Sequence, residues 1–92
     1  MRKISQDRIE KYMNVTQEAL EKAENASKED EDSAEEVLDM VRRYLSDAKF
    51  FRENEEYVDC FASLNYAHGW LDCGARLGFY DVDDDTLFTV SE

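Results

Sequence analysis

The apolar positions of the chain recur three and four residues apart in three consecutive stretches, the spacing of helices that bury one face. No proline interrupts them. The pattern predicts helices over residues 5–26, 34–52 and 55–77, followed by a tail over residues 79–92. Amphipathic helices with short connections favour an all-α fold. We therefore expect an antiparallel up-and-down three-helix bundle with a short extended C-terminal tail, forming one domain over residues 1–92.

Capping residues mark the ends of the predicted helices. Ser5 precedes the first helix as an N-cap. Ser33 and Glu36 have the spacing of a capping box at the start of the second helix, after the acidic connector SKEDED. Asn54 is the expected N-cap of the third helix, and Gly78 is expected to end it in the left-handed conformation.

The second and third helices require a reversal of the chain between them. At about 100° per residue, the apolar stripe of the second helix, extended without a break, points roughly half a turn away from the stripe of the third. One straight helix would therefore face its two halves in opposite directions. A turn near residues 52–56 removes the conflict.

The third predicted helix is apolar over most of its circumference. One apolar group is centred on Leu64 and Leu71, and a second on Tyr66 and Trp70. A helix of this kind is normally covered by more than one neighbour. The first two helices supply two covers, and the tail or a second subunit is a candidate for the third.

The tail contains a short β-prone segment, TLFTV, over residues 86–90. A single segment cannot form a sheet. Two alternatives remain: it lies extended across the bundle with Leu87 and Phe88 against the third helix, or it is a loose end that seeks a partner.

The chain is strongly acidic, with 11 basic and 23 acidic residues and a net charge of −12. Nucleic acids and anionic membrane surfaces repel such a chain, so neither is an expected partner. The N-terminus has no apolar core typical of a signal peptide, and no run of about 18 apolar residues predicts a membrane span. The expected location is the cytoplasm.

The two cysteines are expected to be free, buried thiols. Cys60 and Cys73 are thirteen residues apart on one predicted helix, hence about 20 Å apart. A disulfide requires Cα atoms within about 7 Å, so they cannot pair within one chain. Free thiols fit a reducing compartment.

A narrow polar stripe on the third helix surrounds a glycine, and aromatic residues lie beside it. A glycine inside a helix costs about 1 kcal/mol relative to alanine, which suggests a specific reason for Gly69. Close packing within the bundle is the first explanation, and a binding surface is the second. The candidate ligand or partner surface comprises Asn65, His68, Gly69, Asp72, Arg76, Trp70 and Tyr66.

His68 and Asp72 are four residues apart, so their side chains meet on one helix face. The pair suits the start of a metal site, but no third ligand is evident. The alternative is a half-buried histidine oriented by a carboxylate. The run of aspartates after residue 80 resembles the start of a calcium loop, but Thr86 occupies the position that requires glycine. We assign neither a metal nor a cofactor.

No catalytic residues are assigned. The chain has one histidine, His68, and it is the only candidate base for either cysteine. Cys60 lies over ~10 Å from it along the helix axis, and Cys73 points to a different side. The sequence therefore favours a protein without enzymatic activity.

The stretch Asn65 to Gly78, NYAHGWLDCGARLG, resembles the signature helix of an archaeal family known as domain of unknown function 357. An alanine of that signature is replaced here by Cys73, and Tyr57 and Asp59 match its Tyr-x-Asp start. The resemblance implies a three-helix bundle similar to the albumin-binding bundles of bacterial surface proteins. It implies no function, because the family has none assigned and a fold alone specifies no activity.

We therefore expect a non-enzymatic cytoplasmic interaction or scaffold module, with an unknown protein partner or with itself. The alternative is a small-ligand or metal-binding protein that uses the polar stripe. Exposure of Tyr66 and Trp70 favours the first function. A pocket in which a third polar group joins His68 and Asp72 favours the second. Complete burial of the stripe weakens both.

Overall fold

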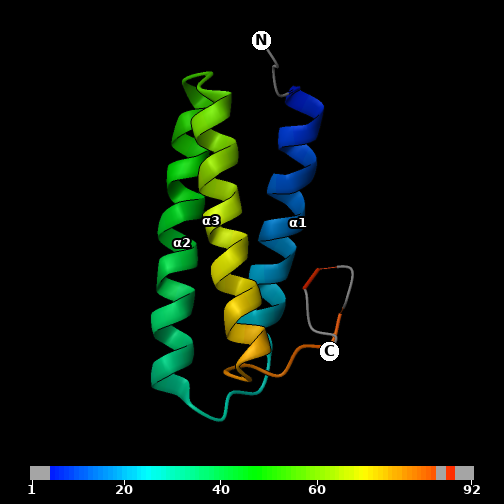
Figure 1. Ribbon diagram of the computed structural model, residues 1–92, viewed down its shortest axis with the longest axis vertical. Helices are drawn as coiled ribbons and strands as arrows, with labels where there is room; N and C mark the ends of the chain where they lie inside the picture. Colours follow the sequence, from blue (N-terminus) through cyan, green and yellow to red (C-terminus); the bar gives the residue numbers. More distant parts are fainter. Residues whose placement is uncertain (1–4, 85–86, 89–92) are drawn as a thin grey trace.

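A computed structural model describes residues 5–84 and 87–88 of the chain. It contains the helices α1 (Gln6–Asn25), α2 (Glu31–Glu53) and α3 (Tyr57–Arg76), and the described residues form no strand. The chain runs down α1, up α2 and down α3, so consecutive helices are antiparallel, and α3 lies between the other two in the view of Figure 1. It packs most extensively against α2, less against α1, while α1 and α2 touch least. The expected three-helix bundle is thus confirmed.

The first helix begins where its cap predicts. The Ser5 hydroxyl accepts a hydrogen bond from the Arg8 amide at 3.2 Å, which satisfies one of the free N–H groups of the first turn. The apolar stripe faces the other helices. Its buried residues are Ile9, Met13, Thr16, Ala19, Leu20 and Ala23.

The second helix begins one turn earlier than its sequence predicts. Its N-cap is Asp30, whose carboxylate accepts from the amide and the hydroxyl of Ser33 at 3.1 and 2.7 Å. The expected capping box of Ser33 and Glu36 is therefore wrong, and Glu31 belongs to the helix rather than to the connector. A carboxylate suits this position because it also faces the positive end of the helix dipole.

The reversal between α2 and α3 is confirmed, but Asn54 has a different role in it. Asn54 ends α2 as its C-cap and donates from its side chain to the Phe50 carbonyl at 2.9 Å. Glu55 follows with a φ of 57°, in the left-handed region that usually belongs to glycine. The amide of Glu56 then bonds the Phe51 carbonyl at 2.8 Å. The expected N-cap at Asn54 is wrong, because the chain uses this residue to close the preceding helix.

The end of α3 follows the sequence prediction. Gly78 has a φ of 78°, and its amide bonds the Ala75 carbonyl at 3.1 Å. The amide of Phe79 bonds the Gly74 carbonyl at 2.9 Å. These two bonds form the Schellman motif, in which a residue without a Cβ takes the left-handed position.

The tail turns back onto the lower end of the bundle (Figure 1). Tyr80, Leu87 and Phe88 are buried in the common core, and the rings of Tyr80 and Phe88 have their centroids 6.4 Å apart. The amides of Leu87 and Phe88 both bond the Asp84 carbonyl, so these two residues lie in a turn, not in the extended segment predicted. The rest of the TLFTV segment (residues 86, 89 and 90) lies outside the described residues.

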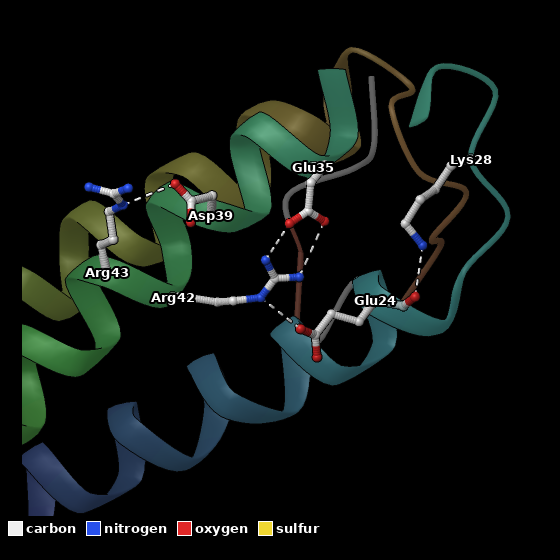
Figure 2. A network of polar contacts seen from close by, with 6 residues as sticks. All are labelled: Glu24, Lys28, Glu35, Asp39, Arg42 and Arg43. Carbon is white, nitrogen blue, oxygen red and sulfur yellow. Dashed lines mark hydrogen bonds and ion pairs between the residues drawn. The ribbon is translucent and has the colours of Figure 1, made fainter. Parts of the chain in front are cut away.

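Surface ion pairs connect the elements at this end. The Arg42 guanidinium on α2 donates to Glu24 of α1 at 3.0 Å and to Glu35 at 2.7 Å (Figure 2). It also lowers the pKa of the Glu35 carboxyl, mainly through this hydrogen bond. Lys22 pairs with Asp84 of the tail at 2.9 Å. Exposed pairs of this kind each contribute between about 0 and 1 kcal/mol, so they orient the helices more than they stabilise them.

Candidate functional site

One side of α3 is not covered by the described parts of the chain. A spacing of three or four residues places six residues along this side, around a shallow groove of about 560 Å³. Tyr66 is 62% and Trp70 37% exposed, and no member of the set is charged. We call this set the outer face of α3. It comprises Ala62, Asn65, Tyr66, Gly69, Trp70 and Cys73.

Two sequence expectations about this face are wrong. Gly69 was expected to be explained first by packing within the bundle, but it is exposed and a Cβ built on it would meet nothing within 4 Å. Cys73 is exposed rather than buried. Neither α1, α2 nor the described tail covers this side, because Tyr80 packs on the last turns of α3 and Asp84 pairs with Lys22 of α1.

One aromatic residue of the outer face, Tyr66, is held in position by α2. The ring of Tyr66 stacks on Tyr44 of α2, with centroids 5.2 Å apart and planes 17° apart. Two further apolar side chains, Val58 and Leu77, are 67% and 62% exposed near the two ends of α3. An apolar strip therefore runs along the length of the helix.

A second feature, the α1–α3 cleft, lies beside the outer face and encloses about 340 Å³. The Nδ1 atom of His68 lies 3.4 Å from the hydroxyl of Thr16, which is itself buried. The Nε2 atom of His68 lies 3.7 Å from a carboxylate oxygen of Asp72. The cleft is lined by Tyr12, Val15, Thr16, Leu64, Asn65, His68, Gly69 and Asp72.

The structure thus divides the predicted surface. Tyr66 and Trp70 belong to the outer face, whereas His68 and Asp72 belong to the cleft. Asn65 and Gly69 line both features. The side chain of Arg76, one turn after Asp72, is exposed and lines neither of them.

The contribution of α1 to the cleft was not predicted from the sequence. Thr16 adds a buried hydroxyl to the polar groups of Asn65, His68 and Asp72 that line the cleft. The signal was present, since Thr16 is a hydroxyl-bearing residue within an otherwise apolar stripe, and buried hydroxyls require a hydrogen-bond partner. Among the described residues no group of three histidine, cysteine or carboxylate side chains has the geometry of a metal site.

Neither cysteine has the surroundings of a catalytic nucleophile. Burial raises the pKa of the Cys60 thiol, which disfavours the reactive thiolate. Cys60 lines neither the groove nor the cleft. Cys73 is accessible, but it lies on the outer face, whereas His68 lines the cleft.

Together, the fold and the outer face of α3 define a small acidic three-helix bundle with one exposed apolar strip. The chain belongs to the family of proteins of unknown function called DUF357, whose model matches residues 11–80. A comparison with curated proteins found no significant match, and neither did a comparison with solved structures. No helix among the described residues is long and apolar enough to cross a membrane.

Proposed function

We propose that this protein is a non-enzymatic interaction module of the cytoplasm, and that its outer face of α3 binds a helix of a protein partner. The observation that supports this is the exposure of Tyr66 and Trp70 on a face without a charged residue. Aromatic residues are enriched and acidic residues depleted where proteins bind one another. Because the chain has a net charge of −12, an uncharged apolar strip differs in polarity from the rest of its surface.

The shape of the strip suits a helix. The groove follows α3 along a row of side chains, and Gly69 leaves space at its middle. An amphipathic helix laid in such a groove is a common mode of recognition. Tyr66, already stacked on Tyr44, loses little side-chain freedom when it is covered. The free thiols of the chain support a reducing compartment.

The test uses Cys73, which lies on the outer face, as a reporter. A membrane-permeant maleimide is applied to the native cells and, separately, to the purified protein at low micromolar concentration. We expect Cys73 to react more slowly in the cells, at least fivefold, because a partner covers it. A variant with Cys73→Ser and Ser46→Cys serves as control, since Ser46 is exposed on α2.

The control thiol should react equally fast in both settings. Equal rates for Cys73 in cells and in dilute solution would contradict the proposal, because the face would then be free in the cell. The buried Cys60 reports unfolding in either setting.

A second candidate function is the binding of a small ligand in the α1–α3 cleft. It is favoured by the convergence of Thr16, His68 and Asp72 on one cavity. Binding would raise the unfolding temperature by linkage. Calorimetry with zinc, nickel, manganese and a short diamine tests it, and Thr16→Val is the control variant. No shift with any of these probes would argue against cations as the ligand.

A further inference from the structure

The outer face of α3 has a spacing that fits a second copy of itself. Its central residues Ala62, Tyr66, Gly69 and Cys73 are four, three and four residues apart, which is the spacing of the seam between two paired helices. The exposed Val58 and Leu77 continue the row by four residues at each end. The row therefore reads the same from either end.

From this symmetry we propose that the protein forms a homodimer in which two α3 helices pair antiparallel through their outer faces. The inference rests on the proposed function and names its partner. In this register, Tyr66 lies level with Gly69 of the second copy, and Ala62 lies level with Cys73 of the second copy. Two-fold symmetry repeats each pairing, as in most homodimers.

Side-chain size supports the antiparallel register. A large residue, Tyr66, meets a residue without a side chain, Gly69, twice at the centre of the contact. Space is available there, since no atom lies within 4 Å of a Cβ built on Gly69. A mid-helix glycine otherwise costs about 1 kcal/mol relative to alanine. The close approach of a second backbone gives a reason for glycine at this position, whereas packing within one copy gives none.

Charged residues at the two ends of the outer face favour antiparallel over parallel pairing of two copies. The antiparallel register places Asp59 level with Arg76 of the second copy, so charges of opposite sign share each end of the contact. A parallel pairing would instead place Asp59 level with Asp59 of the second copy. Like charges brought together in this way disfavour association.

The contact is small, so the dimer is weak. With aromatic side chains of about 150–250 Å² each, the exposed parts of Tyr66, Trp70, Val58 and Leu77 amount to roughly 400–500 Å² per copy. The pair buries roughly 800–1,000 Å², which is at the lower limit for specific association. We therefore expect a dissociation constant between ~1 µM and ~1 mM.

Sedimentation equilibrium of the full chain over this concentration range tests the proposal. We expect wild-type protein to change from monomer to dimer. Gly69→Glu should weaken the dimer at least tenfold by placing carboxylates at its centre, with the fold retained because the position is exposed. Ser46→Glu adds the same charge to the outside of α2 and should change the affinity less than twofold.

A cross-link tests the register independently of any change in affinity. Ala62→Cys places a thiol level with Cys73 of the second copy, whereas the same two thiols within one chain are eleven residues, or about 16 Å, apart. Mild oxidation should give a covalent dimer linked between positions 62 and 73. A dimer linked only between identical positions would overturn the antiparallel arrangement.

A wild-type protein that stays monomeric at ~1 mM would also overturn the inference, as would a dimer unaffected by Gly69→Glu. These results are distinct from failure of the proposed function. If purified protein is monomeric while Cys73 is protected in cells, the outer face binds a different protein. If Cys73 is unprotected in cells, the proposed function itself fails.

Discussion

The ring of Tyr80 lies directly over Gly74, where the tail turns back onto the last turns of α3. The Tyr80 hydroxyl donates a hydrogen bond to the Leu71 carbonyl one turn earlier, and the side chain is buried. A Cβ at Gly74 would lie 2.6 Å from the Cζ atom of Tyr80. Within one chain, Gly74 and not Gly69 is therefore the glycine that close packing requires.

Gly74→Ala should destabilise the protein by about 1–3 kcal/mol, because the ring of Tyr80 has to move. Gly69→Ala is the matched control in dilute, monomeric protein, where it should stabilise by up to about 1 kcal/mol because alanine favours the helix and meets no atom of its own chain. Urea denaturation measures both. Equal stability of Gly74→Ala and wild type would mean that the tail does not pack against α3 as described.

Alkaline pH should act on Tyr80. Burial, and secondarily the Asp72 carboxylate, raises the pKa of its phenol well above the ordinary value. The unfolded chain releases this proton near pH ~10, so the contribution to stability is complete below that pH and declines as pH rises towards the folded-state pKa. Urea denaturation from pH 9 to 11.5 should show this loss.

Tyr80→Phe separates the ionisation from the hydrogen bond. At pH 9 the variant should be less stable by about 1 kcal/mol, which is typical of a lost hydrogen bond. The gap to wild type should narrow above pH ~10, since phenylalanine cannot ionise. Leu87→Ala is the control, because it destabilises the protein without removing an ionisable group. Its difference in stability from wild type should stay constant as the pH rises. A constant difference for Tyr80→Phe as well would show that ionisation of the phenol has no effect.

Glu55→Gly should stabilise the reversal between α2 and α3. Glu55 has a φ of 57°, and a side chain in this region costs about 1–2 kcal/mol. Glycine removes that cost but loses more freedom on folding, so we expect a net gain of about 0.5–1 kcal/mol. Ser46→Gly, at an exposed position inside α2, should destabilise. A thermal melt that ranked the two variants the other way would contradict the assigned turn.

The two thiols should differ in reactivity. In dilute native protein one thiol per chain, Cys73, should react rapidly with an aromatic disulfide reagent, and two should react after unfolding in guanidinium. Cys60 is buried and its pKa is raised by that burial. Cys73→Ser should abolish the rapid phase. Two rapid thiols in the folded wild type would show that the core around Cys60 opens.

Periodicity was sufficient to predict the helices because each buries a continuous apolar stripe. The phase change between Ala48 and Phe61 required a reversal, and the structure places it there. Gly78 was predictable as well, since few other residues tolerate its conformation.

The caps were harder to predict, because several residues could fill each position. Asp30 and Ser33 lie three residues apart and both are good N-caps, so the sequence alone does not decide which one begins α2. Glu55 takes a backbone conformation that favours glycine, because the short connection between α2 and α3 requires this conformation at its position. At Glu55, therefore, the path of the chain overruled the local preference of the residue.

For the candidate site, the sequence pattern does not predict which apolar residues stay exposed. Periodicity identifies Tyr66 and Trp70 as apolar positions, but it does not say whether anything covers them. That depends on the path of the tail, which packs Tyr80 over Gly74 rather than along the outer face. The part of Thr16 in the cleft depends on the alignment of α1 beside α3, which no local pattern encodes.

The unequal contacts of the three helices also set the order in which they come apart. The α2–α3 hairpin is closed by a turn of three residues, between Glu53 and Tyr57, and has the densest contacts in the fold. Local contacts of this kind form early in folding, and dense ones open last. Amide hydrogen exchange should therefore be slowest in α2 and α3. The first helix, with fewer contacts, should exchange first, and its departure would open the α1–α3 cleft while leaving the outer face of α3 intact.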